Sequence, residues 1–435
     1  MSDFLGRLKA IEPIERLEAF VIDVNGCPRG KWMSPAKARK LSETGLLLPR
    51  SAFALDIEGK DVAGAGLAFG TGDPDGTCVP VESTLFPVSW SANRAAQVLL
   101  TMEVDGQPFY GDPRAMLGRV LKGFEAAGLR PTVAVETEFY LVRGEQQVSP
   151  MPGAGDLLSL VALQEQEAFL NDVASACKTM NLDLESILSE NAPGQFEINI
   201  SYSDNALKAA DDAVLFKRCI KAIARQHGLT ATFMSKPFGD IAGSGMHVHI
   251  GLLGPDGVSV FGQDDVSPNA PMRHAIGGLL TNMADSMLAF APHANSYRRF
   301  RRNSHAPCSA CWGIDDRTAA VRAIPSSPAR IEHRVAGADA NPYLVVALVL
   351  AGVLEGIQRE VDPGGPQDPQ EGGEAGGRLP LDWRAAISKF ETSDFVARAL
   401  GENARDMIAA CKWQDFDLLL SRVSDVEHQL YLSQA

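Results

Sequence analysis

Four short stretches of this chain alternate strictly between functional and apolar side chains, and this alternation limits the folds open to the chain. In a β-strand, residues two apart lie on the same face of the sheet. Each predicted strand therefore has one functional face and one apolar face. The functional residues are Glu136 and Glu138; Gln195, Glu197 and Asn199; His247 and His249; and Arg330, Glu332 and Arg334. We expect an antiparallel sheet whose apolar face is covered by helices and whose polar face lines a cavity.

The carboxylates of the predicted polar face are candidate ligands for two divalent cations. Residues of one face are about 7 Å apart along a strand, so Glu136 and Glu138 cannot share one small ion but can each serve one of two. The two predicted sets are Glu138, Glu190 and Glu197; and Glu136, His247 and Glu332. Oxygen ligands with a single imidazole suit magnesium or manganese. Taken singly, each glutamate is more simply a solvated or ion-paired strand residue, and His247 a hydrogen-bonded core histidine.

Eight arginines fall between Asn295 and Arg334, in a chain whose formal net charge is −14. Guanidinium groups this close repel one another unless an anion lies among them, and their planar fork suits phosphate and carboxylate. A solvated basic face is the alternative, but Phe300, Trp312 and Ile331 interrupt the run, which favours a cleft. Arginines beside two metal sites predict a polyphosphate substrate, namely ATP. The sequence has no Walker-type glycine loop, so the nucleotide site is of another kind.

Length and composition favour a globular chain of two domains. At 435 residues the chain can bury a large core. Asp112-Pro-Arg114 has the pattern of a helix start, and glycine-punctuated short strands precede it. We therefore expect a small β-rich domain at 1–111 and a second domain at 112–435. No apolar run reaches about 18 residues and the N-terminus lacks the apolar core of a signal peptide, so a cytoplasmic protein with no membrane partner is expected.

Other features of the sequence exclude some classes of protein. The acidic charge balance argues against binding of nucleic acid. Seven cysteines at irregular spacing do not predict a disulfide framework. Cys308 and Cys311 form a CxxC pair without a second pair, and we interpret both as ordinary thiols. Residues 362–378 are rich in proline and glycine, which predicts an exposed and mobile loop.

Taken in order, the motifs resemble those of the glutamine synthetase family in its bacterial type I form. Any one of these motifs is weak, but together they span nearly the whole chain. The matching segments are Asp23-Val-Asn-Gly26 with Arg29-Gly-Lys31; Val135-Glu136-Thr-Glu138-Phe; Gly194-Gln195-Phe-Glu197; Lys236-Pro237; Gly243-Ser-Gly-Met-His247-Val-His249; Asn295-Ser-Tyr-Arg-Arg; Arg317-Thr-Ala-Ala-Val-Arg322; and Arg330-Ile-Glu332-His-Arg334.

The resemblance implies an α+β fold with a small N-terminal β-grasp domain. A catalytic domain follows, with a curved antiparallel sheet backed by helices. Members of the family use ATP to convert the γ-carboxylate of glutamate to γ-glutamyl phosphate, which an amine then attacks. The implied metal ligands are the two sets already named. Each active site would hold two or more magnesium or manganese ions.

The resemblance also implies roles for individual side chains. The implied assignments are Arg299, Arg334 and Gly243 for glutamate; Arg317 and Arg322 for the transferring phosphate; and Arg330, His249 and Arg322 for the nucleotide. Asp56 matches the aspartate that receives ammonium from the neighbouring subunit, although its loop lacks the usual paired serines. This polar loop has no evident partner in its own chain. The resemblance therefore implies a homododecamer of two stacked hexameric rings with active sites between subunits.

Two positions depart from the pattern of members that use ammonia. The flap glutamate six residues after Arg299 is here His305, and the asparagine before Gly-Ser-Gly is here Ala242. Ammonium must be held as a cation and deprotonated, which favours a carboxylate, whereas histidine has no fixed negative charge. We therefore expect a ligase that joins glutamate to an organic amine, such as putrescine, another polyamine or a monoamine, with His305 as a catalytic base. True glutamine synthetase and a catalytically silent family member are the alternatives.

Overall fold

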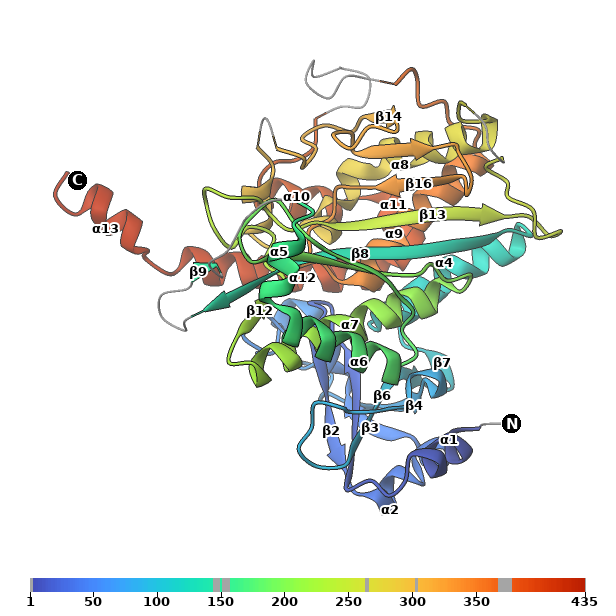
Figure 1. Ribbon diagram of the computed structural model, residues 1–435, viewed down its shortest axis with the longest axis vertical. Coiled ribbons are helices and arrows are strands. Elements are labelled where there is room, and N and C mark those ends of the chain that lie inside the picture. Colours follow the sequence, from blue (N-terminus) through green and yellow to red (C-terminus); the bar gives the residue numbers. More distant parts are fainter. Residues whose placement is uncertain are drawn as a thin grey trace.

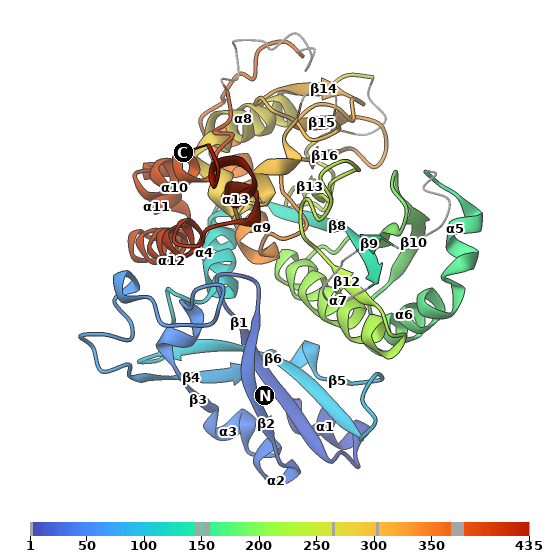
Figure 2. The same ribbon diagram turned by 90° about the vertical axis from the view of Figure 1, so that its left-hand side faces the viewer.

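The computed structural model describes residues 3–143, 149–150, 157–262, 266–301, 304–366 and 378–434, which form two β-sheets surrounded by helices (Figures 1 and 2). The first sheet has the order β2-β1-β6-β4-β3, and β5 and β7 pair with β6. Its strands are β1 (Arg16–Ile22), β2 (Pro28–Met33), β3 (Leu46–Pro49), β4 (Asp75–Pro80), β5 (Phe86–Pro87), β6 (Ala95–Val104) and β7 (Gln107–Pro108). Helices α1 (Phe4–Ile11), α2 (Pro35–Ala38) and α3 (Leu41–Thr44) accompany it. The small β-rich N-terminal unit is thus present.

The second sheet has the order β10-β11-β8-β13-β16-β15-β14, and β9 and β12 pair with β8. Its strands are β8 (Arg130–Arg143), β9 (Ser149–Pro150), β10 (Leu184–Ser189), β11 (Gln195–Ile200), β12 (Thr230–Thr232), β13 (Met246–Leu253), β14 (Trp312–Ile314), β15 (Val321–Ile324) and β16 (Arg330–His333). The four strands predicted from the alternation are β8, β11, β13 and β16. They are consecutive neighbours and pair antiparallel, as expected. At the far edge, however, β14 runs parallel to β15, so a wholly antiparallel sheet is wrong there.

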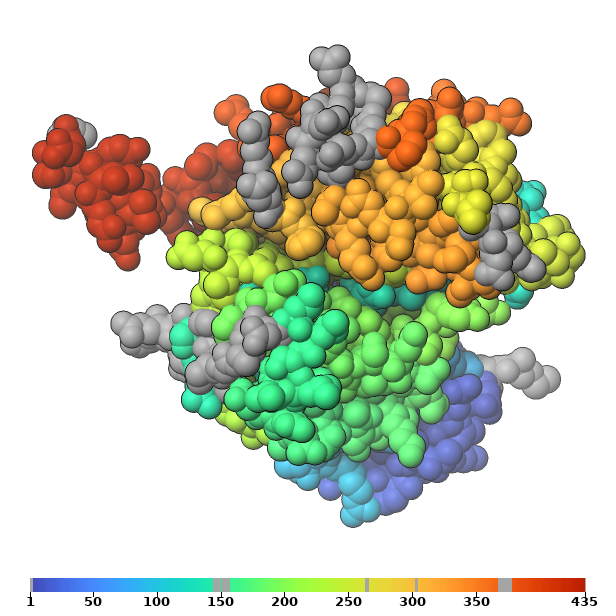
Figure 3. Space-filling model, turned by 45° about the horizontal axis from the view of Figure 1, so that its top comes forward, coloured from blue at the N-terminus to red at the C-terminus, as the bar shows by residue number. Residues whose placement is uncertain are grey.

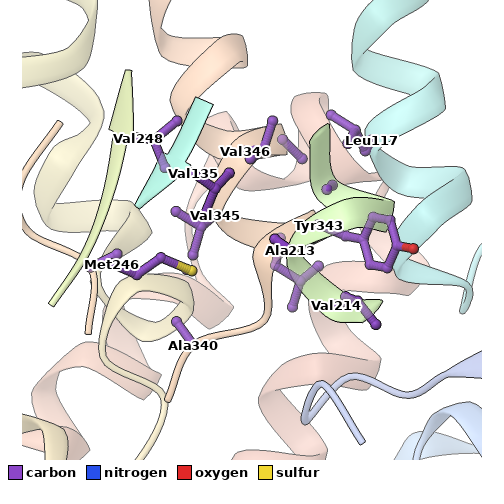
Figure 4. Close-up of a cluster of buried hydrophobic side chains, with 14 of the residues drawn as sticks. Leu117, Val135, Ala213, Val214, Met246, Val248, Ala340, Tyr343, Val345 and Val346 are labelled. Atoms are coloured by element: carbon purple, nitrogen blue, oxygen red, sulfur yellow. The ribbon is translucent and has the colours of Figure 1, made fainter. Parts of the chain in front are cut away.

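Long helices cover the apolar face of this sheet. The helices of this part are α4 (Pro113–Ala126), α5 (Leu160–Glu165), α6 (Glu167–Thr179), α7 (Ala206–Gln226), α8 (Ala270–Phe290), α9 (Pro342–Gln358), α10 (Trp383–Glu391), α11 (Asp394–Leu400), α12 (Glu402–Leu420) and α13 (Asp425–Tyr431). Val135 of β8 and Val248 of β13 point toward Val345 and Val346 of α9 (Figure 4). All four side chains are buried, so the predicted apolar face of the sheet is confirmed.

Local signals fixed the start of α4 but not the limits of every helix. The Asp112 carboxylate accepts a hydrogen bond from the backbone N–H of Arg114 at 2.9 Å, and Pro113 is the first helical residue. Helices α5 and α6 are separate elements, because the backbone of Gln166 between them leaves the helical conformation (φ −113°). The predicted domain boundary at residue 111 falls between the end of β7 and the start of α4. The boundary itself stays a prediction.

Two further expectations concern the C-terminal part and the cysteines. Of the loop predicted at 362–378, residues 367–377 lie outside the described residues. None of the seven cysteines, all of which are described, forms a disulfide bond. None of the described helices combines the length and the apolar character needed to cross a membrane.

Helix α13 buries none of its residues and projects from the body of the molecule, where it is drawn in red (Figure 3).

Candidate active site

The pairing of the strands places the acidic and imidazole side chains in one row across the second sheet. Glu197 of β11 lies opposite Glu138 of β8, and Glu136 of β8 lies opposite His247 of β13. His249 in turn lies opposite Glu332 of β16. Residues opposite each other on neighbouring strands have their Cβ atoms only about 5 Å apart. Side chains from four strands therefore meet on the polar face, as the alternation predicted.

The first predicted metal set converges. Glu138, Glu190 and Glu197 each offer an oxygen, and the three oxygens lie within 4.8 Å of one another. Glu190 follows β10, and its backbone N–H donates to the carbonyl of Gln195 at 2.9 Å, which holds it beside β11. Burial and the charges of neighbouring glutamates raise the pKa of Glu197 to about 9 and that of Glu190 to about 7. This cluster must therefore bind either protons or cations.

The second predicted set also meets, with one addition. His247 Nδ1 lies 3.6 Å from a Glu332 oxygen and 4.0 Å from a Glu136 oxygen. His249, which we had assigned to the nucleotide, reaches the same carboxylates, and its Nε2 lies 3.1 Å from Glu136. Glu136, His249 and Glu332 form one group with ligand atoms within 4.8 Å, and Glu136, Glu197 and His247 form another. The cross-strand register decides this, because it puts His249 directly opposite Glu332.

The charge states of the second set suit metal binding. Burial lowers the pKa of His247 well below its usual value, and the charges of Arg334 and Arg299 lower it further. The imidazole is therefore neutral, as a metal ligand must be. Burial opposes ionisation of Glu136, but its hydrogen bond to His249 and the charge of Arg334 hold its pKa below the usual value.

Three of the predicted arginines border this row. Arg322 donates from Nη1 to Glu332 at 3.1 Å and from Nε to Asp315 at 3.0 Å. Arg334 donates to the other oxygen of Glu332. Arg330 donates from Nε to His249 Nδ1 at 3.3 Å. The Nε of Arg334 is buried and has no hydrogen-bond partner among the described residues, so it can donate to a ligand.

Arg299 is buried close to Arg334 and Gly243. Its guanidinium is buried and donates to the backbone carbonyls of Val335 at 2.8 Å and of Arg334 at 3.3 Å. A Cβ added at Gly243 would lie 3.0 Å from the Arg299 side chain and 2.6 Å from the Ser235 carbonyl oxygen. The close approach of Arg299 is thus a structural reason for glycine at this position. Binding of glutamate by Arg299 and Gly243 stays a prediction.

Arg317 and His305 make no polar contact with the described residues of the acidic row. Both side chains are exposed, and neither has a hydrogen bond or ion pair with any residue in the described part of the chain. Arg317 lies close enough to Asp315 for its charge to help lower the pKa of that carboxyl, chiefly an effect of the hydrogen bond from Arg322. His305 follows residues 302–303, which lie outside the described residues.

Asp56 corrects the expectation that its loop lacks a partner within the chain. The side chain is 2% exposed. Its Oδ1 accepts from the backbone N–H groups of Glu58 at 2.9 Å and Lys60 at 2.8 Å, and its Oδ2 accepts from Gln414 of α12 at 2.8 Å. Arg422 also pairs with Glu58. Gln414 and Arg422 lie more than 350 residues further along the chain than this loop, so no local sequence pattern could indicate these contacts.

Two functional side chains went unassigned in the sequence. Gln195 donates from Nε2 to Glu138 at 3.2 Å and to the Gly243 carbonyl at 3.0 Å, which orients that glutamate. The signal was present, because Gln195 lies on the predicted polar face. Asp315 binds Arg322 from the end of β14. No alternation marked it, because β14 is only three residues long.

The donor set fits a pair of divalent cations. The ligands are carboxylate oxygens with neutral imidazole, which suits magnesium or manganese better than a soft thiophilic ion. Glu138 is held for this role, since it accepts from the Gly245 N–H at 2.8 Å as well as from Gln195. The raised pKa of Glu197 records the same excess of negative charge that a cation would neutralise.

Comparisons with known proteins agree with this geometry. The family model for the glutamine synthetase catalytic domain matches residues 110–431. The chain is 37% identical over 438 residues to gamma-glutamylputrescine synthetase PuuA of Escherichia coli (strain K12), covering 96% of this chain and 92% of the relative. It is 33% identical to a glutamate–isopropylamine ligase of a Pseudomonas species, with 81% and 80% covered. It is 31% identical to the glutamine synthetase of Thermotoga maritima, with 81% and 84% covered.

A solved structure described as apo GmaS without ligand superimposes with a TM-score of 0.88 at 27% identity, over the whole length of both chains. The likeness therefore includes the N-terminal sheet as well as the region that the family model matches. On the match of the family model and of relatives over most of its length, this chain belongs to the glutamine synthetase family.

Proposed function

We propose that this chain is an ATP-dependent ligase that joins the γ-carboxylate of glutamate to an organic amine through γ-glutamyl phosphate. The observation that carries the proposal is the row of carboxylates and imidazoles across four strands, bordered by Arg322, Arg330 and Arg334. Two relatives of high coverage are named as ligases of glutamate or a γ-glutamyl group with an amine, which supports an amine other than ammonium.

Divalent ions would be held by two sets of residues. Glu138, Glu190 and Glu197 form the first set, and Glu136, His247 and Glu332, with His249 beside them, form the second. Bound magnesium or manganese would neutralise phosphate oxygens and so make the γ-phosphorus of ATP open to attack. Gln195 and the Gly245 N–H fix the orientation of Glu138 for this task.

The arginines are proposed to act on the phosphates. The hydrogen bonds of Arg322 to Glu332 and Asp315 fix the orientation of its guanidinium. Its remaining N–H groups are proposed to donate to the phosphoryl group during transfer. Arg317 is exposed and would add a second guanidinium when the substrates are bound. Arg330 and His249 are joined by a hydrogen bond and are proposed to contact the nucleotide. In this reaction a γ-carboxylate oxygen bonds to the γ-phosphorus, and ADP leaves.

Glutamate is proposed to lie beside Arg334. The unpaired Nε of this buried arginine can donate to an α-carboxylate. Arg299 supports this site from behind, because its guanidinium holds the backbone carbonyls on either side of the bond between Arg334 and Val335. The amine nitrogen then attacks the carbonyl carbon of γ-glutamyl phosphate, the new C–N bond forms and inorganic phosphate leaves.

The choice of amine is proposed to depend on His305. An exposed imidazole can accept a proton from an attacking alkylammonium, but it offers no fixed negative charge to capture ammonium. We expect an organic amine to exceed ammonium by at least about tenfold in kcat/KM, roughly 1.4 kcal/mol of transition-state discrimination. The test is phosphate release with ATP and glutamate against ammonium, monoalkylamines and diamines.

The variant His305→Glu tests the same point, with His305→Gln as the matched control. The glutamate variant should raise the ratio of ammonium-dependent to amine-dependent activity, and the glutamine variant should not. A wild type that prefers ammonium, with His305→Glu no better, would replace the proposal by glutamine synthetase proper. No phosphate release with any amine would favour a silent family member.

We also propose a ring-shaped homododecamer in which the Asp56 loop of one subunit completes the site of the next. Gln414 and Arg422 of the same chain hold the loop in place. A fixed conformation suits a loop that presents its side chains to a neighbouring subunit. Ile57, at the tip of the loop, is 48% exposed and available for a contact. Sedimentation at equilibrium would decide, because an active monomer contradicts the assembly.

A further inference from the structure

A large cavity lies between helix α7 and strands β1 and β2, and no residue of the acidic row lines it. Its volume is about 1220 Å³, enough for a small organic molecule. Its walls come from β1 and β2, from α7, from the β12 region and from the end of α12. In Figure 1, α7 lies between strand β8 and the N-terminal strands.

Three cations of α7 line this cavity without an acidic partner. Lys217, Lys221 and Arg225 are spaced by four residues, so they form one row along the helix, about 6 Å apart. No ion pair joins any of the three to a carboxylate among the described residues. Like charges at this spacing destabilise a helix. The side chain of Lys217 is half-buried, and those of Lys221 and Arg225 are exposed.

Three of the four acidic residues of the cavity pair with other cations, and only the charge of Asp339 acts on the row, where it opposes the burial that lowers the pKa of Lys217. Glu18 pairs with Arg16 and with Arg218. The other three bind elsewhere: Glu58 to Lys60 and Arg422; Asp415 to Lys412 and the backbone of Ile57; and Asp339 to the hydroxyls of Ser235 and Ser296. The cavity therefore keeps a local positive charge on the α7 side.

The deepest of the three cations shows the strain of this arrangement. Lys217 donates to the backbone carbonyls of Ala338 at 2.7 Å and Ala340 at 3.2 Å. Burial and the charge of Lys221 together lower the pKa of Lys217 to about 7, against the opposing charge of Asp339. A bound anion would relieve the repulsion between the two ammonium groups.

The remaining walls are apolar and partly aromatic. Phe233 lies between the two lysines, with its ring centre 5.2 Å from Lys217 Nζ and 5.5 Å from Lys221 Nζ. Phe20 and Trp90 face the cavity from the N-terminal sheet, and both stack with the Arg218 guanidinium. Phe20 and Phe233 are only 5% and 4% exposed, so the accessible ring surface comes from Trp90 and from Trp32, which also lines the cavity, while the cations offer donors to an anionic group.

We propose that this cavity is a binding site for a small molecule that carries a phosphate on a planar body, separate from the catalytic row. The three cations match a dianionic phosphate better than a single carboxylate, because they supply up to three positive charges and lysine ammonium groups bind phosphate as point charges. Trp32 and Trp90 would pack against the planar part. The site adds a second ligand to the protein beyond the substrates of the proposed ligase reaction.

The probe for the test is 4-bromophenyl phosphate, whose bromine can be located by anomalous diffraction in a crystal. Titration calorimetry should show binding to the wild type, and the double variant Lys221→Met/Arg225→Met should weaken it at least tenfold. Neither side chain has a hydrogen bond or ion pair in the described structure, so the variant should fold normally. Lys178→Met removes one exposed charge of the neighbouring helix α6 and should change the affinity less than twofold.

Two further measurements complete the test. The bromine peak is expected beside Trp32 and Trp90, and 4-bromobenzoate should bind at least tenfold more weakly than the phosphate. No binding by the wild type, equal binding by the double variant, or a bromine peak only among the arginines of the catalytic row would each overturn the proposal. Equal affinity for 4-bromobenzoate would overturn the phosphate specificity.

Discussion

The variant Glu197→Gln should stabilise the metal-free protein at neutral pH and abolish much of its stabilisation by metal. In the folded chain the pKa of Glu197 is raised from an ordinary 4.5 to about 9, so the carboxyl keeps its proton at pH 7, where the unfolded chain has lost it. The folded state binds the extra proton, so stability is greatest below pH 4.5 and falls as pH rises toward 9. Glutamine occupies the same space without this penalty.

The magnitude follows from the interval between the ordinary pKa and the working pH. One pH unit corresponds to about 1.4 kcal/mol, and about 2.5 units separate 4.5 from pH 7, so the gain is at most about 3.5 kcal/mol. At pH 5 the gain should fall below about 1 kcal/mol. Manganese at 100 times its dissociation constant stabilises the wild type by about 2.7 kcal/mol, and the variant should lose most of this.

The assay is urea unfolding at pH 5, 6 and 7, in EDTA and in manganese. Glu185→Gln is the matched control, because Glu185 is an exposed glutamate of β10 outside the cluster. It should change stability by less than about 0.5 kcal/mol at every pH. The reasoning is refuted if metal-free Glu197→Gln is no more stable than the wild type at pH 7, or if manganese stabilises both proteins equally.

Three other predictions test the site and its surroundings. Manganese affinity should rise between pH 5 and pH 8, because the pKa values of Glu190 and Glu197 are about 7 and about 9 and metal binding must release their protons. Calorimetry in buffers of different ionisation enthalpy would detect the released protons. An affinity that does not change with pH would contradict the prediction. Arg299→Ala should lower the free energy of unfolding by roughly 2–4 kcal/mol, because two buried carbonyls lose their donor, whereas the exposed Arg298→Ala should have little effect in the same urea titration. Leu158 has φ +60° and is 65% exposed, so Leu158→Gly should raise the melting temperature by relieving about 1 kcal/mol of backbone strain, while Leu158→Ala should not.

The strand alternation determined which side chains would share a face. That inference needs only the two-residue period of an extended chain, so Glu136 and Glu138, and likewise His247 and His249, could be placed together before any fold was known. The helix start at Asp112 was equally local, because an N-cap and a following proline act within one turn. The apolar face of β8 and β13 against α9 follows from the same period.

The tertiary structure alone decided how these faces combine. Only the cross-strand register brings His249 to Glu136 and Glu332, and only the return of α12 to the N-terminal unit gives Asp56 its partner Gln414. The donors of Arg299 meet backbone carbonyls because β16 ends beside that arginine. These contacts join residues from about 35 to more than 350 positions apart, and their geometry depends on the packing of the whole chain rather than on local propensity. The sequence therefore determines the chemistry of each face, and the packing decides which groups meet.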